Sequence, residues 1–219
     1  MEAQPELSIA QGRYELLSAL GEGGMAYVFR CTDTRLKVDR AVKFLAPRLM
    51  RHSQIRERFE SEASTMALLN HPNIVQIFDI GNEKSLVYMV MELLDGGSVQ
   101  DRIERHGVLE PIQAIDVAIA MARGLGFAHR NNVIHRDVKL DNVLISKEGT
   151  PKVADFGIAR VNDGRSGMTM TGAVMGTLAY MAPEQRLSAR RAGPQADLYA
   201  VAASLYVMLS SENPSELFN

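Results

Sequence analysis

Apolar residues in the first part of the chain follow the short runs typical of β-strands. Runs at residues 14–17 and 26–30 flank a glycine-rich turn, and three more lie at residues 41–45, 74–78 and 86–91. Because the runs are short and turn residues separate them, they predict an antiparallel sheet of five strands. Residues 1–12 lack any period and include Pro5 and Gly12, so they are expected to form a loose tail.

Helical spacing appears between the third and fourth runs and again after the sheet. Residues 53–70 predict one amphipathic helix, with apolar positions at Ile55, Phe59, Met66 and Leu69. A longer helix is expected from Pro111 to about residue 130, with an inner face made of Ile115, Ile119, Ala122 and either Leu125 or Gly126. The uncharged run at residues 198–209 predicts a buried helix. The chain therefore belongs to the α+β class.

Composition narrows the class of protein without naming a partner. Of the 219 residues, 46% are hydrophobic and 23% are charged, as in an ordinary globular protein. A net charge of −2 gives no general attraction to nucleic acid, so no nucleic-acid partner is expected. Cys31 is the only cysteine, no export signal is visible, and the longest apolar run is shorter than the roughly 20 residues of a membrane span. A cytoplasmic location without a membrane segment is expected.

Residues 135–142, His-Arg-Asp-Val-Lys-Leu-Asp-Asn, concentrate the side chains that can do chemistry. An aspartate such as Asp137 can accept the proton of an attacking hydroxyl, and Lys139 can neutralise charge on a phosphate. The amide oxygen of Asn142 can bind a hard cation beside a second carboxylate, which Asp155 would supply. One loop can therefore bring together groups that act on a hydroxyl, a phosphate and a cation.

Two features nearer the N-terminus fit the same chemistry. The turn at residues 21–24, Gly-Glu-Gly-Gly, lets backbone amides approach a phosphate closely, although such a turn alone is usually an ordinary hairpin. No helix follows it, which argues against a dinucleotide-binding motif. Lys43 is either the solvent-facing residue of its strand or a residue that points toward a phosphate.

Four motifs in this order resemble those of the eukaryotic-type serine/threonine protein kinases, bacterial branch. They are the glycine-rich turn with Gly21, Gly23 and Val28, residues 135–142, Asp155-Phe156-Gly157, and residues 176–184, Gly-Thr-Leu-Ala-Tyr-Met-Ala-Pro-Glu. Ala26 stands in place of the family's third glycine, and Leu140 stands where a proline is frequent. The resemblance covers about residues 13–210.

The resemblance implies a two-lobed protein kinase fold. Residues 13–94 would form an N-lobe with the five-stranded antiparallel sheet and one helix, and residues 95–219 a mainly helical C-lobe. The family's C-lobe continues through further helices, so the chain is expected to be C-terminally truncated. The truncated chain itself is expected to be weakly stable or inactive and to self-associate.

The implied reaction moves the γ-phosphoryl group of ATP to Ser or Thr of protein substrates, with Mg²⁺. The roles carried over are these: Asp137 orients the hydroxyl, Lys139 and Lys43 counter phosphate charge, Glu62 pairs with Lys43, and Asn142 and Asp155 bind Mg²⁺. Glu57 and Glu60 are the alternatives to Glu62. Residues expected to contact ATP are Leu20, Gly21, Glu22, Gly23, Gly24, Val28, Ala41, Lys43, Met91, Glu92, Leu94 and Leu144, with the backbone of Glu92 and Leu94 on the adenine edge.

Regulation is expected in residues 158–174, which are rich in polar and small residues. Thr169 or Thr171 would be phosphorylated, and the phosphate would pair with Arg136, which is expected to be buried at a cost unless an anion reaches it. Self-association or trans-autophosphorylation is expected. Thr177 would contact the catalytic Asp and Lys.

Three points stay open from the residues. Asp197 either caps the 198–209 helix or, as in the family, holds the catalytic loop. A small-molecule kinase would lack residues 176–184, and a kinase-fold binding module without activity would lack a catalytic group. None is missing among Lys43, Glu62, Asp137, Asn142 and Asp155, and the binding module stays the alternative for a truncated chain.

Overall fold

The chain forms two compact units. The computed structural model describes residues 8–23, 25–83, 86–156, 178–188 and 192–214, apart from the side chain of Glu62. The first unit consists of Met1–Asn70 and Val75–Leu94, and the second of His71–Ile74 and Asp95–Asn219. Among the described residues, no helix combines the length and the apolar character that a membrane span requires.

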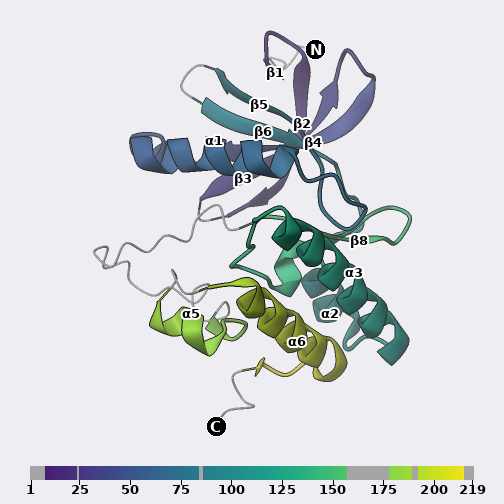
Figure 1. Cartoon of the computed structure of the whole chain (residues 1–219). Helices are drawn as coiled ribbons and strands as arrows, with labels where there is room; N and C mark the ends of the chain where they lie inside the picture. Colours follow the sequence, from purple (N-terminus) through teal and green to yellow (C-terminus); the bar gives the residue numbers. More distant parts are fainter. Residues whose placement is uncertain (1–7, 24, 84–85, 157–177, 189–191, 215–219) are drawn as a thin grey trace. The chain divides into compact units, whose positions relative to one another are not determined.

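A curled antiparallel sheet makes up most of the first unit (Figure 1). Its six strands lie in the order β1-β2-β3-β4-β6-β5. The strands are β1 (Ser8–Ile9), β2 (Tyr14–Glu22), β3 (Ala26–Asp33), β4 (Val38–Leu45), β5 (Ile77–Glu83) and β6 (Leu86–Met91). The five predicted strands are therefore present, and β1 adds a sixth at the edge.

Helix α1 (Ser53–Ala67) lies along one face of this sheet, and a short 3-10 helix, η1 (Pro47–Leu49), precedes it. Phe59, Met66 and Leu69 are buried as the helical period predicted, whereas Ile55 is half-buried. The predicted apolar face thus packs on the sheet over most of its length.

Strand β1 corrects the expectation of a loose tail for Ser8 and Ile9, which pair with Glu15 and Tyr14. Ile9 is buried in the core of the sheet, and the backbone amide of Ala10 donates to Glu83 Oε2 at 2.5 Å. The Glu83 contact spans 73 positions, so no local period in the tail predicts it.

An ion-pair network fastens β2 to its neighbours. The Arg13 guanidinium donates to Asp33 Oδ2 at 3.0 Å and to Asp79 Oδ2 at 3.1 Å, and the Tyr14 hydroxyl donates to the same Asp79 atom at 2.8 Å. Burial is the main reason why the pKa of Tyr14 is raised, and the bond to Asp79 adds to it. Three strands of the sheet are therefore tied together at one end.

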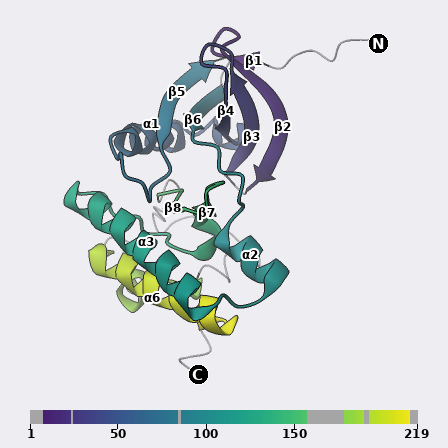
Figure 2. The ribbon, with the colours of Figure 1, turned by 90° about the vertical axis from the view of Figure 1, so that its right-hand side faces the viewer.

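The second unit is mainly helical. It contains α2 (Val99–His106), α3 (Pro111–Arg130), the 3-10 helix η2 (Leu140–Asn142), the strand pair β7 (Val143–Ile145) and β8 (Pro151–Val153), α5 (Pro183–Leu187) and α6 (Pro194–Ser210). Helices α3 and α6 pack side by side (Figure 2). Helix α2, which was not predicted, begins at a capping box in which Ser98 and Asp101 exchange hydrogen bonds between side chain and backbone.

The predicted inner face of α3 is wrong except at Leu125. Ile115 and Ile119 are 48% and 43% exposed, and Ala122 is exposed too. The buried face instead consists of Ala114, Val117, Ala120, Met121, Gly124, Leu125 and Ala128. Small residues allow close approach: a Cβ on Gly124 would lie 2.6 Å from the carbonyl oxygen of Asn73. The prediction of a helix was right, but the large apolar residues were wrongly assigned to its buried face.

Residues 71–74 belong to the second unit because their backbone pairs there. The Val153 amide donates to the Asn73 carbonyl at 2.9 Å, and Asn73 Nδ2 donates to the Pro151 carbonyl at 3.0 Å. Ile74 therefore forms a bridge with Val153. Strand β5 consequently begins at Ile77, three residues later than predicted.

Helix α6 is only partly buried, which corrects the expectation for residues 198–209. Leu198 and Leu209 are 52% and 43% exposed, whereas Ala200, Ala203, Val207 and Met208 are buried. Small residues again make up much of the buried face.

Candidate active site

The loop between α3 and β7 contains residues 135–142, and side chains bind the backbone groups of His135, Arg136 and Asp137. His135 is fully buried and stands at the start of the loop. Its Nδ1 atom accepts a hydrogen bond from the Asp137 amide at 3.2 Å, so the ring proton lies on Nε2, which donates to the Ala154 carbonyl at 2.9 Å. Burial lowers the pKa of His135, which keeps this neutral tautomer in place. The ring thus connects the loop to the strand end that precedes Asp155.

Asp197, in the first turn of α6, holds the loop from below. Its Oδ2 atom accepts from the His135 amide at 2.9 Å and its Oδ1 atom accepts from the Arg136 amide at 2.8 Å. His129 Nε2 lies 2.7 Å from Oδ2. Asp197 is 1% exposed, so these partners compensate the burial of its charge. Of the two roles left open for Asp197, the structure shows the loop contact. The N-cap of α6 is Gly193.

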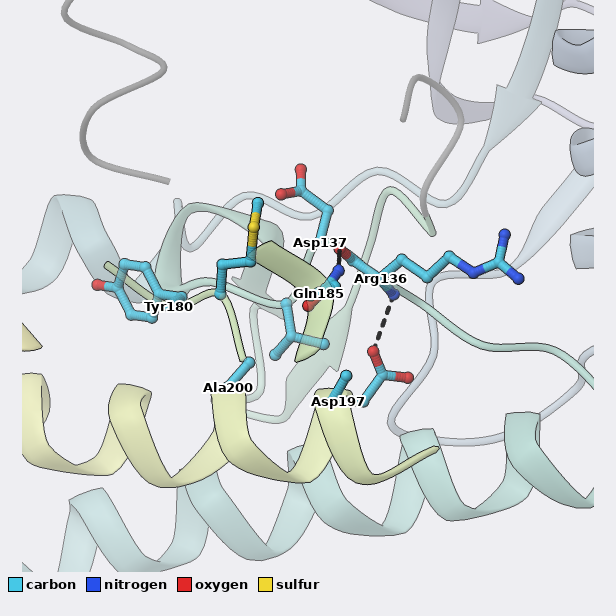
Figure 3. A pocket seen from close by; sticks show the side chains of 9 residues that line it. Arg136, Asp137, Tyr180, Gln185, Asp197 and Ala200 are labelled. Atoms are coloured by element: carbon cyan, nitrogen blue, oxygen red, sulfur yellow. Dashed lines mark hydrogen bonds between the residues drawn. The ribbon is translucent and has the colours of Figure 1, made fainter. Parts of the chain in front are cut away.

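Arg136 carries backbone strain at the centre of this arrangement. Its φ of 63° lies in the left-handed region, which costs a residue with a side chain about 1 to 2 kcal/mol. Its amide is bound by Asp197, and its carbonyl accepts from Gln185 Nε2 at 2.7 Å (Figure 3). The surrounding side chains therefore compensate a conformation that the loop would not adopt alone.

The Arg136 side chain is exposed and extends away from the Asp197 carboxylate (Figure 3). The expectation that this arginine is buried at a cost is therefore wrong. The backbone of Arg136 makes the contacts with Asp197 and Gln185, while its guanidinium is exposed to solvent.

Asn142 lies where a cation ligand was predicted. Its Nδ2 atom donates to the Asp137 carbonyl at 2.8 Å, an assignment that the carbonyl forces because it can only accept. The Oδ1 atom is thereby left as the acceptor of the amide. The Ala154 amide donates to the Asn142 carbonyl at 2.8 Å, so the residue that precedes Asp155 is bound to Asn142. Oxygen donors of this kind suit a hard cation such as Mg²⁺.

Asp155 is exposed and has a φ of 54°, a second left-handed residue in this region. The residue before it is fixed by His135 and Asn142, and the ring of the buried Phe156 lies 4.5 Å from that of His135 between centroids. Asp155 is therefore an exposed carboxylate on a firmly held backbone. Among the described residues, no three His, Cys, Asp or Glu side chains form a cluster that could hold a metal ion. A cation bound by Asn142 and Asp155 would therefore need further ligands that are not side chains of such a cluster.

A small pocket lies beside the loop, lined by Arg136, Asp137, Val138, Tyr180, Met181, Gln185, Ala196, Asp197 and Ala200 (Figure 3). Its volume of about 10 Å³ has room for one water molecule at most. Burial, with a smaller contribution from Asp141, raises the pKa of Tyr180 to about 12. The pocket is therefore a contact between the loop and α5 and α6, and a nucleotide does not fit in it.

In the first unit, Lys43 is 9% exposed in the middle of β4. It pairs with Val28 on β3 and with Met89 on β6. The alternative of a solvent-facing lysine is therefore excluded. Ala41, also predicted to contact ATP, is buried two residues earlier in the same strand.

The glycine-rich turn joins β2 to β3. Gly21 pairs with Val28 and Glu22 with Tyr27, and the Gly23 amide donates to the Ala26 carbonyl at 2.9 Å. Leu20 is half exposed, and Gly21 and Glu22 are also exposed. The hairpin predicted here is confirmed.

The end of β6 carries the predicted adenine contacts. The Glu92 amide donates to the Gln76 carbonyl at 2.9 Å, so a ligand would meet the other backbone groups of this segment. Met91, Glu92 and Leu94 are all half-buried, and Leu144 of β7 in the second unit is half-buried as well.

Five predicted site residues lie outside the described part of the chain: Gly24, Thr169, Thr171, Thr177 and the side chain of Glu62, although the Glu62 backbone is in α1. Two side chains at the loop were not predicted, His129 and Gln185. A histidine in the last turn of a helix ordinarily meets the helix dipole, and a glutamine in a short polar segment is ordinarily solvated. Nothing local in the sequence distinguishes either residue.

Residues 14–218 match the family described as the protein kinase domain, so the chain belongs to the protein kinase family. The order of glycine-rich hairpin, strand lysine and the loop at residues 135–142 is the order of the motifs in that family.

Curated relatives are bacterial serine/threonine-protein kinases. The chain is 40% identical to serine/threonine-protein kinase PknB of Mycobacterium leprae over 98% of its own length and 34% of that protein. It is 41% identical to PknB of Mycobacterium tuberculosis over 92% of its length and 33% of that protein. The chain thus spans about a third of these relatives.

A solved structure is similar as well. The PknI kinase domain of Mycobacterium tuberculosis, solved as a point mutant, matches with a TM-score of 0.76 and 26% identity, covering 98% of this chain and 79% of that one. The fold predicted from the motifs is confirmed as that of a protein kinase domain.

Proposed function

We propose that the chain transfers the γ-phosphoryl group of ATP to Ser or Thr hydroxyls of protein substrates. The observation that carries the proposal is the hydrogen-bonded frame of residues 135–142, in which Asp137 is held at its amide by His135 and at its carbonyl by Asn142. A frame of this kind suits phosphoryl transfer, where positioning and electrostatics supply most of the rate.

Each side chain has a separate task in the proposal. Asp137 orients the substrate hydroxyl and accepts its proton as the oxygen attacks phosphorus. Lys139, two residues later in the same loop, neutralises negative charge on the transferred phosphoryl group. Lys43 binds phosphate oxygens of ATP, and its low exposure in the middle of β4 supports this role because a lysine on the solvent face of the strand would be exposed.

Asn142 and Asp155 would hold Mg²⁺, whose positive charge neutralises phosphate oxygens when it is bound. The Oδ1 atom of Asn142, which the bond from Nδ2 to the Asp137 carbonyl leaves as an acceptor, and the exposed carboxylate of Asp155 fit an oxygen-binding cation. The left-handed backbone at Asp155 is consistent with a functional constraint, because such strain concentrates at active and ligand-binding sites.

ATP contacts in the first unit are proposed at the glycine-rich turn and at the end of β6. The exposed residues Leu20, Gly21, Glu22 and Gly23, together with Gly24, would cover the phosphates, and Glu62 would pair with Lys43. The backbone of Glu92 and Leu94 would bind the adenine edge. Val28, Ala41, Met91 and Leu144 would contact the ring. Residues 13–94 and 95–219 would act as the two lobes of the kinase.

Phosphorylation of Thr169 or Thr171 is proposed as the activating step, with Thr177 contacting the substrate end of the site. The exposed guanidinium of Arg136 is accessible to a phosphate and can bind it with two parallel hydrogen bonds. Mass spectrometry after incubation with ATP should find phosphate on these threonines, and the double alanine variant should be much less active. Wild-type activity in that variant would contradict the switch. Trans-autophosphorylation and a cytoplasmic location stay predictions.

The function is tested with radiolabelled ATP, Mg²⁺ and a general protein substrate. The proposal expects label on serine and threonine of the substrate, no label on tyrosine, and loss of transfer when the metal is chelated. Lys43→Met and Asp155→Asn should weaken the nucleotide-bound state. Nucleotide binding without any transfer would instead support the alternative, a kinase-fold binding module without activity.

A further inference from the structure

We propose that Gln185 is a positioning residue that sets the orientation of Asp137 by holding the Arg136 carbonyl. This inference rests on the proposed function and adds to it a residue that does not touch ATP or the substrate. The contact is direct: Gln185 Nε2 donates to the Arg136 carbonyl at 2.7 Å across 49 positions of sequence (Figure 3).

The geometry of one peptide group explains the effect. The Arg136 carbonyl and the Asp137 amide belong to the same planar unit. Gln185 binds the oxygen of that unit, and His135 Nδ1 accepts from its nitrogen at 3.2 Å. A peptide plane held at both of its polar atoms is restrained against rotation, which restricts the direction in which the Asp137 side chain leaves the backbone.

The strained backbone of Arg136 requires hydrogen bonds such as the one from Gln185. Its φ of 63° is an unfavourable conformation that only surrounding contacts can maintain. Asp197 binds the Arg136 amide and Gln185 binds the Arg136 carbonyl, from helices α6 and α5. Without Gln185, the peptide group that follows this strained residue keeps only one side-chain partner, His135 Nδ1 on the Asp137 amide.

Helices α5 and α6 are connected by one apolar cluster. Ala182, which precedes α5, packs in a small apolar cluster with Ala192 and Ala196, and all three are buried. Ala196 and Asp197 are neighbours in the first turn of α6. The two side chains that hold Arg136 are therefore carried by elements that are packed against each other.

The same short helix is tied to the segment before it. Arg186 Nε donates to the Met181 carbonyl at 3.1 Å, and its Nη2 atom donates to the Leu178 carbonyl at 3.0 Å. A shift of residues 178–181 would move α5 and, through Gln185, the peptide group of Asp137. We therefore expect Gln185 to transmit the position of this segment to the loop.

The test uses three variants of the 219-residue chain with one control. Gln185→Ala removes the donor, Gln185→Glu replaces it with a carboxylate that only accepts, and Gln185→Lys restores a donor on a chain of similar reach. The control is Gln113→Ala, an exposed glutamine in the first turn of α3. All four proteins are assayed for kcat, for KM of ATP and for melting temperature.

The loss of one positioning hydrogen bond should lower kcat about tenfold in Gln185→Ala and further in Gln185→Glu. KM for ATP should stay within about twofold, and the melting temperature within about 4 °C, as expected for one hydrogen bond in a chain of this length. Gln185→Lys should return kcat to within about threefold of wild type. Equal losses in the Lys and Ala variants, or a wild-type kcat in Ala and Glu, would overturn the proposal.

Hydrogen–deuterium exchange gives a readout that does not need activity. The peptide that covers residues 133–140 should exchange faster in Gln185→Ala than in wild type and in Gln113→Ala, because the held peptide group opens more often. If wild type transfers no phosphate, the proposed function fails and this exchange alone decides the role of Gln185. Unchanged exchange in Gln185→Ala would overturn it.

Discussion

The backbone of the loop at residues 135–142 and that of the glycine-rich turn at residues 21–24 are held by different kinds of hydrogen bond. In the loop, Asp197, His135, Asn142 and Gln185 bind backbone groups through their side chains, and the centre of the loop is partly buried. In the described part of the turn, the hydrogen bonds come from strand pairing and from the Gly23 amide, and the residues are exposed.

This difference corresponds to what each segment has to do in the proposed reaction. A proton acceptor must face one hydroxyl in one direction, and a misplacement of about 1 Å can cost on the order of 100-fold in rate. A turn that covers phosphates needs a backbone that can approach them closely, which glycine permits. Side chains therefore hold the backbone of the loop, whereas the turn is held by strand pairing and, in the proposed reaction, by the bound ATP.

The largest effect is expected from Asp197→Ala. This change removes the acceptor of the His135 and Arg136 amides and the partner of His129, and leaves buried donors unpaired. We expect the free energy of unfolding to fall by about 3 to 5 kcal/mol, measured by urea unfolding. Asp116→Ala, at an exposed position of α3, is the control. A loss under about 1 kcal/mol would mean that side chains do not hold the loop.

A smaller effect is expected from acidification. Burial lowers the pKa of His135, so the folded state binds fewer protons than the unfolded state below about pH 6.5. Stability should therefore fall as the pH drops from about 7.5 to about 5.5, and melting curves should show a smaller fall in His135→Gln, although that variant is less stable overall. The pKa of Asp101 is lowered by its hydrogen bonds to Ser98, so its contribution is lost only below about pH 4.

Two other histidines sharpen this experiment. Burial also lowers the pKa of His71, which adds to the same pH window in both proteins. His106 is exposed at the end of α2, so His106→Gln should reproduce the wild-type pH dependence. An identical fall in His135→Gln and wild type would show that the loop does not require a neutral His135.

The smallest effect on stability is expected in the turn. A Cβ on Gly21 would meet no atom within 4 Å, and its φ is not in the left-handed region. Gly21→Ala should change the free energy of unfolding by about 1 kcal/mol or less, since a compatible Gly-to-Ala change mainly restricts the unfolded chain. In the proposed site it should raise KM for ATP several-fold. A loss of stability as large as that of Asp197→Ala would remove the contrast between the two segments.

Sequence patterns predicted most of the sheet and the helices, because these depend on local period. They could not decide the role of Asp197, whose contact with the His135 amide spans 62 positions and exists only in the folded chain. The predicted inner face of α3 was wrong because large apolar residues were taken as core residues. Ile115 and Ile119 are exposed, and the buried face consists largely of alanines and Gly124, which let the neighbouring backbone come close. The hydrogen bond from Gln185 likewise has no local signature.

The central claim is that Asp137 acts on the incoming hydroxyl and not on the nucleotide. The most direct measurement compares Asp137→Asn with wild type, by phosphoryl transfer to a protein substrate and by ATP binding in a titration. The proposed function predicts a loss of transfer of about 10²- to 10⁴-fold, with the dissociation constant for ATP within about twofold. Transfer at the wild-type rate, or an equal loss of ATP binding, would contradict it.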